Sequence, residues 1–138
     1  MMLKTIAYWI TTILGPASFI IGGSLQLTQS EQPVAALNHL GYPSYFLFLL
    51  GTWNILGAIA VVVPGFPLLK EWAYAGFFFL LTGAAASHAF AGDPFFSSGP
   101  FQIAPPLVFL LLVGASWALR PASRRLPGTV RDGLERVP

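Results

Sequence analysis

Few residues in this chain could do chemistry, and the two histidines are the most informative of them. An imidazole is the side chain whose charge most readily changes near neutral pH. His88 falls within a long apolar segment, where an ionisable side chain is costly to bury and therefore marks a candidate functional site. A neutral His88 that is hydrogen-bonded to a neighbouring helix is an equally good interpretation. His39 lies in a more polar stretch and is interpreted as a surface residue.

Two amides in apolar surroundings extend this candidate site. Gln26 and Asn54 each need hydrogen-bond partners once they are removed from water. An interhelical hydrogen bond would satisfy Asn54, and a bound polar group would do so as well. We expect a mostly apolar pocket in the outer half of the helical bundle, with His88 as the main hydrogen-bond partner of a ligand. The predicted ligand-binding residues are Gln26, Trp53, Asn54, Ser87 and His88, and the candidate residues at the pocket mouth are His39, Asp93 and Gln102.

Composition excludes several other kinds of chemistry. The chain has no cysteine, so thiolate catalysis, disulfides and cysteine metal sites are ruled out. Two histidines with carboxylates only near the predicted surface do not predict a metal site. No serine–histidine–aspartate spacing, phosphate-binding loop or dinucleotide fingerprint is present. The formal net charge is only +2, so nucleic acid is not an expected partner.

The elements that position these residues are predicted to be four membrane-spanning helices. Charged residues make up 9% of the 138 residues and hydrophobic residues 55%, against about 25% charged in a soluble domain. The charges leave long gaps, and a helix needs about 20 apolar residues to cross the hydrocarbon core. We therefore predict an all-α, four-helix up-down bundle that forms a single domain over residues 1–120. Its spans are predicted at about 5–27, 45–63, 72–92 and 101–119, followed by a basic tail over 121–138.

The basic residues predict the orientation of these spans. All seven lysines and arginines fall on one side of a four-span arrangement, and Glu31 and Asp93 fall on the other. The positive-inside rule then places both termini in the cytoplasm. Between the first two spans, Ser30 to Pro43 is predicted to form a short interfacial helix that ends at Gly41.

The stretch from Leu40 to Asp93 resembles the DoxX-like family of small four-helix membrane proteins. The residues that carry the resemblance are Leu40-Gly41-Tyr42-Pro43, Gly51-Thr52-Trp53, Leu56-Gly57, Pro64-Gly65-Phe66-Pro67, the segment from Leu69 to Phe77, Thr82-Gly83-Ala84, Ser87-His88 and Gly92-Asp93. Weaker similarity extends into the first and last spans. In many members a lysine follows the tryptophan of the second span, and here that position is Asn54.

The resemblance implies relatives in the superfamily of DoxX and the membrane domain of vitamin K-dependent carboxylase, some of which are linked to quinones and redox partners. The leading hypothesis is a multi-pass protein of the plasma membrane, the inner membrane in a bacterium, that binds a quinone- or lipid-like ligand. A membrane protein partner or a homodimer would fit this role. One alternative is a quinone-linked oxidoreductase subunit, although no intrinsic catalytic motif supports an enzyme and no cofactor is certain. Another is an assembly or structural factor without a ligand.

Overall fold

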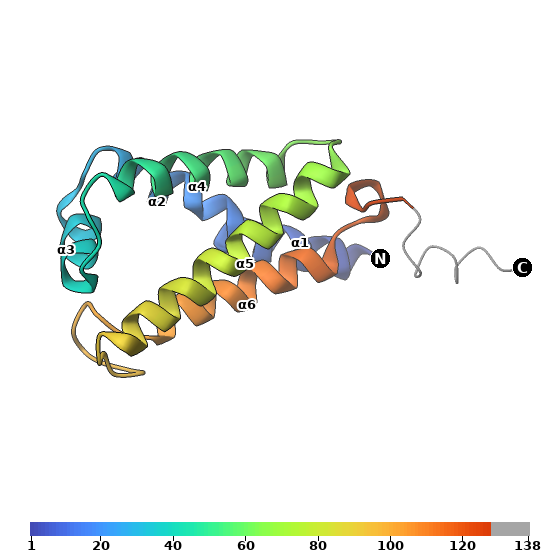
Figure 1. Cartoon of the computed structure of the whole chain (residues 1–138). Coiled ribbons are helices and arrows are strands. Elements are labelled where there is room, and N and C mark those ends of the chain that lie inside the picture. The colour runs from blue at the N-terminus through green and yellow to red at the C-terminus, as the bar shows by residue number, and fades with distance from the viewer. Residues whose placement is uncertain (128–138) are drawn as a thin grey trace, which may run out of the picture.

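A computed structural model describes residues 1–127, which fold into helices joined by turns, without a β-strand among them. The helices are α1 (Met2–Leu14), α2 (Phe19–Leu27), α3 (Glu31–Leu40), α4 (Phe46–Val62), α5 (Pro67–Phe90) and α6 (Ala104–Leu119), with short 3-10 turns at Pro16–Ser18 and Ala122–Arg124 (Figure 1). The predicted all-α class is confirmed. Most of the predicted basic tail lies outside the described residues.

The first predicted span is not one continuous helix. It breaks at Gly15, whose backbone leaves the helical region with φ −96° and ψ −106°, and Pro16 follows directly. Proline lacks the amide proton of an interior helical bond, and its ring clashes with the preceding turn. The predicted span over about 5–27 therefore consists of two helices, α1 and α2, rather than one.

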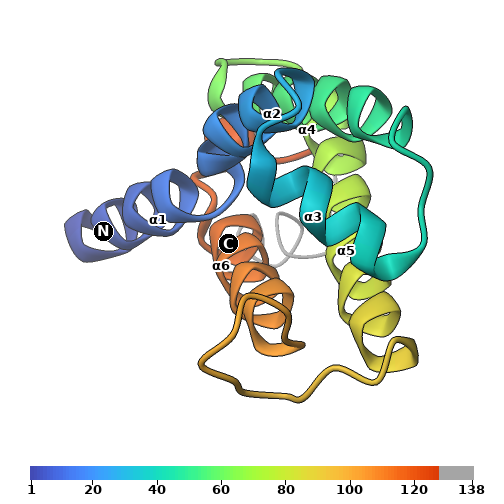
Figure 2. The same ribbon diagram turned by 90° about the vertical axis from the view of Figure 1, so that its left-hand side faces the viewer.

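This break lets the N-terminal segment pack against two different helices. Before it, α1 packs against α6, and after it, α2 packs against α4, while α5 packs against both α4 and α6 (Figures 1 and 2). Phe19 stands at the start of α2 and stacks on Phe77 of α5, with 4.8 Å between ring centroids. A buried hydrophobic cluster lies where α4, α5 and α6 meet and consists of Ala58, Val61, Tyr74, Phe77, Leu81 and Val113.

The short helix α3 lies across one end of the bundle, which we call the α3 end (Figure 2). Its last residue is Leu40, and Gly41 follows in the left-handed conformation with φ 82°, as predicted for the helix stop. Leu37 is the buried residue of α3. The N-terminus and the described part of the tail lie at the opposite end (Figure 1).

Two helices begin at places that differ from the sequence prediction. α5 starts at Pro67 rather than near residue 72, because the left-handed Phe66 turns the chain and proline suits a first helical position. α6 starts at Ala104, so Pro105 and Pro106 lie in its first turn. The first amides of a helix have no partner within it, and the two prolines therefore cause no kink.

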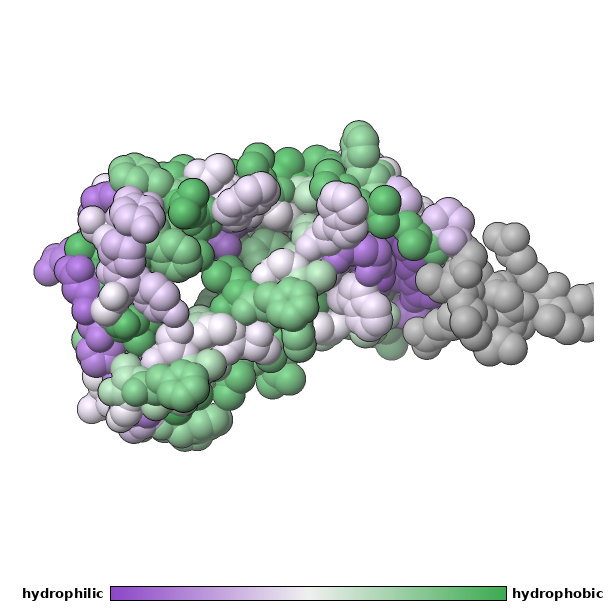
Figure 3. All heavy atoms as spheres, in the orientation of Figure 1, coloured by the Kyte–Doolittle hydropathy of each residue, from purple (hydrophilic) through white to green (hydrophobic). Residues whose placement is uncertain are grey.

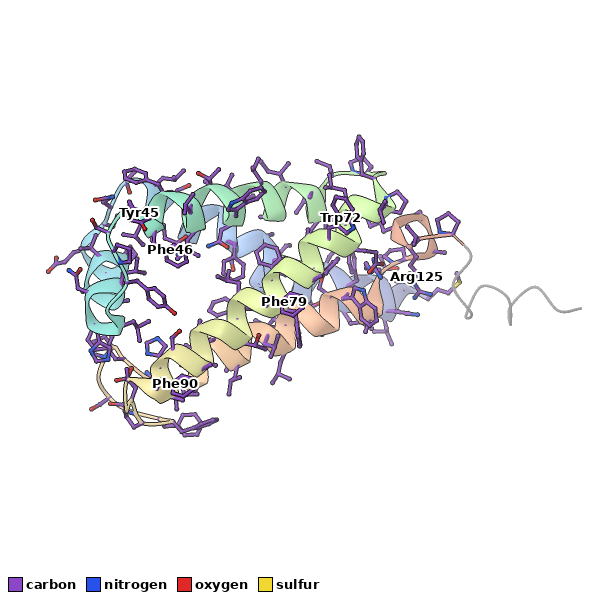
Figure 4. All side chains as sticks on the ribbon, viewed as in Figure 1. Tyr45, Phe46, Trp72, Phe79, Phe90 and Arg125 are labelled. Carbon is purple, nitrogen blue, oxygen red and sulfur yellow. The ribbon has the colours of Figure 1, made fainter. Side chains whose placement is uncertain are left out.

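The outer surface between the two ends is apolar. Large hydrophobic side chains stand exposed along the helices, including Ile21, Phe79 and Leu111, and the hydrophilic residues in this view gather towards the two ends (Figure 3). Tyr45 and Phe90 lie near the α3 end, and Trp72 lies towards the other (Figure 4). Two helical segments, Met2–Leu27 and Pro67–Phe90, are long and apolar enough to cross a membrane, whereas α4 and α6 are apolar but shorter.

Candidate functional site

The polar residues at the α3 end are positioned by two matching helix stops. At the end of α3, Tyr42 N–H donates to the Leu37 carbonyl at 3.0 Å and Gly41 N–H to that of Asn38 at 3.2 Å. This pair of bonds around a left-handed glycine is the Schellman motif. It turns the chain back over the last turn of α3, where His39 lies.

The end of α5 repeats the same motif. Gly92 is left-handed with φ 83°, and its N–H donates to the Ala89 carbonyl at 3.1 Å. Asp93 N–H donates to the His88 carbonyl at 3.0 Å. The backbone thereby holds Asp93 directly above the last turn of α5, next to the His88 side chain.

Asp93 joins the two histidines. Its Oδ2 lies 2.6 Å from His88 Nδ1, and its Oδ1 lies 2.7 Å from His39 Nε2. The side chain of Asp93 is 8% exposed, that of His88 13% and that of His39 30%. The hydrogen bond from His88 is the main cause that holds the pKa of Asp93 below its usual range, and the bond from His39 adds to it.

Two further contacts fix this cluster. The His39 ring stacks on Phe101, with centroids 4.0 Å apart and planes 5° apart. Ser87 donates its hydroxyl proton to the Gly83 carbonyl, so Tyr42 is the donor in the 2.8 Å hydrogen bond between Tyr42 Oη and Ser87 Oγ. We call the set of His39, Tyr42, Ser87, His88 and Asp93 the α3 latch, because its contacts tie α3 to the end of α5.

The two predicted amides meet elsewhere, between α2 and α4. Asn54 Nδ2 donates to Gln26 Oε1 at 2.8 Å. Asn54 is 4% exposed, and its side chain makes no other hydrogen bond to the described residues. One amide N–H and the carbonyl oxygen of Asn54 thus remain available for another group.

An apolar cavity of about 390 Å³ runs between α4 and α5 beside Asn54. Its lining residues are Leu50, Trp53, Asn54, Leu56, Gly57, Ala60, Leu69, Trp72, Ala73, Gly76, Phe77 and Leu80. The space-filling view also shows an opening bounded by α3, α4 and α5, nearer the α3 end (Figure 3). Asn54 is the only side-chain amide in the cavity lining, so a ligand there would meet a mostly apolar wall whose polar side-chain groups are this amide and the indole N–H groups of Trp53 and Trp72.

At the opposite end, two cations bind the last carbonyls of α4. The fully buried Lys70 donates Nζ to the carbonyls of Ala60, at 2.9 Å, and Val63. Arg124 Nη1 donates to the carbonyls of Val61 at 3.1 Å and Val62 at 2.9 Å. These carbonyls have no partner within the helix, and cations are favoured at a helix C-terminus.

A second set of contacts at this end joins α5 to α6. Arg120 Nη1 lies 2.5 Å from Glu71 Oε1, and Trp117 Nε1 donates to Glu71 Oε2 at 3.0 Å. Ser116 hydrogen-bonds Tyr74 at 2.8 Å and Thr12 at 2.6 Å in the interior. Lys70, Arg120 and Arg124 therefore each have a structural partner at this end.

The structure divides the predicted site residues into three places. Trp53 and Asn54 line the α4–α5 cavity. Gln26, on α2, accepts a hydrogen bond from Asn54. Ser87, His88, His39 and Asp93 form the α3 latch at the bundle end. Gln102 lies in the loop before α6, where its amide bonds Ser97 N–H and the Gly99 carbonyl and so holds the loop.

Several residues that contact the predicted site residues, or that hold the opposite end of the bundle, were not predicted from the sequence. Neither Tyr42 nor Phe101 was predicted as a site residue, although Tyr42 belongs to the motif Leu40-Gly41-Tyr42-Pro43, and Lys70 was interpreted only as a loop charge. The helix-ending glycines at 41 and 92 were the available signal, because each predicts which residue folds back over its helix.

The all-helical bundle, its apolar outer surface and its two long apolar helices are typical of a membrane protein. Residues 10–116 match the model of the DoxX-like family. The chain therefore belongs to the DoxX-like family. No curated protein and no solved structure matched it.

Proposed function

We propose that this DoxX-like protein crosses the membrane four times and binds a small quinone- or lipid-like molecule in the α4–α5 cavity. Both termini lie in the cytoplasm in this proposal, and the α3 end faces the other side. The observation that carries the ligand role is the apolar cavity of about 390 Å³ with Asn54 in its wall.

The four-span arrangement is supported by the distribution of charge over the bundle. Lys70, Arg120 and Arg124 gather at one end through the contacts described above, whereas Asp93 and Glu31 belong to the α3 end. A bilayer has a core of about 30 Å, and helices of 17 and 16 residues span roughly 25 Å at 1.5 Å per residue. The difference between the helix length and the core thickness would be covered by the apolar residues that flank α4 and α6 and by slight local thinning of the bilayer.

Cysteine labelling tests this topology, and the chain offers a background-free system because it has no native cysteine. Single cysteines at Gly65 and Arg125 should react with a membrane-impermeant maleimide only after the cells are opened. A cysteine at Ser98, in the loop between α5 and α6, should react in intact cells. Labelling of Arg125→Cys from outside would contradict the four-span arrangement.

The cavity has the properties expected of a small-molecule site. Its volume falls within the range of about 300–1,000 Å³ that such sites occupy. Its wall is built from aliphatic and aromatic side chains, and the free amide groups of Asn54 can hold one carbonyl or hydroxyl. Because the cavity opens between two helices towards the apolar surface, a lipophile could enter from the bilayer.

Filling the cavity with a leucine should prevent ligand binding. A side chain added at Gly76 meets no atom within 4 Å, so Gly76→Leu should fold and occupy the cavity that Gly76 lines. Gly83 lies two turns further along the same helix, is equally free of neighbours and is not part of the lining. Native mass spectrometry of the wild type and of Gly83→Leu in mild detergent should show one retained lipophile, and Gly76→Leu should show none.

The ligand role would be refuted if the wild-type protein, extracted in mild detergent, retained no lipophile. Equal retention by Gly76→Leu and Gly83→Leu would place the lipophile outside the α4–α5 cavity.

A further inference from the structure

We propose that His39, His88 and Asp93 form a binding site for one first-row divalent transition-metal ion at the α3 end. Each residue offers one ligand atom, and these atoms all lie within 4.8 Å of one another. The two imidazoles and one carboxylate come from the last turn of α3, the last turn of α5 and the residue after Gly92. The site is independent of the α4–α5 cavity.

The donor types select the class of ion. Imidazole nitrogens suit zinc, iron, copper and nickel, whereas magnesium and calcium prefer oxygen ligands alone. Two histidines with one carboxylate also leave positions on the ion open, as in catalytic zinc sites and ferrous sites. His39 is the most exposed of the three side chains, so solvent reaches the site on the His39 side.

An ion at this site would change the distances between the three ligand atoms. Zinc binds nitrogen and oxygen at about 2.0–2.2 Å, which puts tetrahedral ligand atoms roughly 3.3 Å apart. The nitrogen–oxygen distances of 2.6 and 2.7 Å are hydrogen bonds, and an ion that replaces the shared protons would widen each by roughly 0.6–0.7 Å. The ligand atoms lie within 4.8 Å of one another, so the two imidazole nitrogens would move closer by up to about 1.5 Å.

Neighbouring groups orient two of the three ligands, Asp93 and His39, without the ion. The Schellman turn at Gly92 fixes the Asp93 backbone above His88. The stack on Phe101 fixes the plane of the His39 ring. Ligands that are oriented in advance by neighbouring groups lose less freedom when an ion binds.

The chain is well suited to a direct binding test. These two histidines are the only ones in the sequence, and there is no cysteine. The full chain, purified in mild detergent without a polyhistidine tag, should bind one equivalent of Co²⁺ and develop the visible spectrum of tetrahedral cobalt. Added Zn²⁺ should displace the cobalt, and Ca²⁺ should not.

Removal of any one ligand should abolish this signal. His39→Gln, His88→Gln and Asp93→Asn should each weaken Co²⁺ binding by more than about a hundredfold, beyond the ten- to hundredfold typical of an outer-shell change. Glu31→Gln, at the start of α3, removes a carboxylate from the same end and should bind like the wild type. Circular dichroism checks that each variant is folded. His39→Gln is the decisive variant, because the side chain of His39 is 30% exposed and its replacement should disturb the fold least.

Two results would overturn the metal site. If the wild type gives no cobalt spectrum, the three residues are a hydrogen-bonded latch only. If binding is unchanged in folded His39→Gln, the ion is held elsewhere on the protein.

Discussion

Replacing Lys70 by glutamate should lower the free energy of unfolding by about 3–5 kcal/mol, the usual effect of breaking a buried charged contact. The lysine is fully buried and donates to two carbonyls at the C-terminus of α4. A carboxylate there would face the same carbonyls, whose partial negative charge repels it. The measurement is unfolding in a detergent titration, followed by tryptophan fluorescence.

Lys4→Glu is the matched control because it makes the same change of charge on an exposed face of α1. A surface substitution of this kind usually changes stability by less than about 0.5 kcal/mol. If both variants unfold alike, Lys70 does not hold the end of α4. Lys70→Met should fall between them, since it loses the hydrogen bonds without adding repulsion.

Replacing Gly23 by leucine should destabilise the protein by about 3 kcal/mol, the upper part of the range for overpacking a tight interface. A Cβ atom at Gly23 would stand 2.8 Å from the Gly51 carbonyl oxygen and 2.7 Å from a side-chain carbon of Ile55. The Gly51 oxygen belongs to the backbone of α4 and cannot move without shifting that helix. The same detergent titration measures the effect.

Gly22 provides the neighbouring control. A Cβ atom there meets nothing within 4 Å, so Gly22→Leu should be neutral or slightly stabilising, because leucine favours a helix over glycine by roughly 0.5–1 kcal/mol. Equal destabilisation by the two leucines would mean that α2 and α4 do not approach at Gly23. Gly23→Leu should also weaken the hydrogen bond between Gln26 and Asn54, which joins the same two helices.

Much of the secondary structure could be predicted from local patterns. α4, at Phe46–Val62, matches the span predicted over 45–63, because turn residues on both sides of an uninterrupted apolar run mark where the helix begins and ends. Gly41 ends α3 as expected, since only a residue that tolerates a positive φ fits that place. The predicted starts of α5 and α6, near residues 72 and 101, were less accurate, because α5 already begins at Pro67 and α6 begins only at Ala104.

The candidate site was harder to predict because its residues are far apart in the sequence. Gln26, Asn54, Ser87 and His88 were placed in one pocket on the basis of similar depth along their helices. Depth does not fix the direction in which a side chain points. In the structure, Asn54 hydrogen-bonds Gln26, whereas His88 hydrogen-bonds Asp93. These two pairs lie in different parts of the bundle.

The sequence by itself determined that the chain is helical and apolar, where most turns fall, and that its charges separate into two groups. These properties follow from composition, periodicity and local turn chemistry. Only the tertiary structure decided that Lys70 is buried against α4, that Pro16 redirects the chain from α6 to α4, and that His39, His88 and Asp93 meet. Each of these depends on how helices cross, and the crossing is set by close packing of side chains from distant segments, which no local pattern encodes.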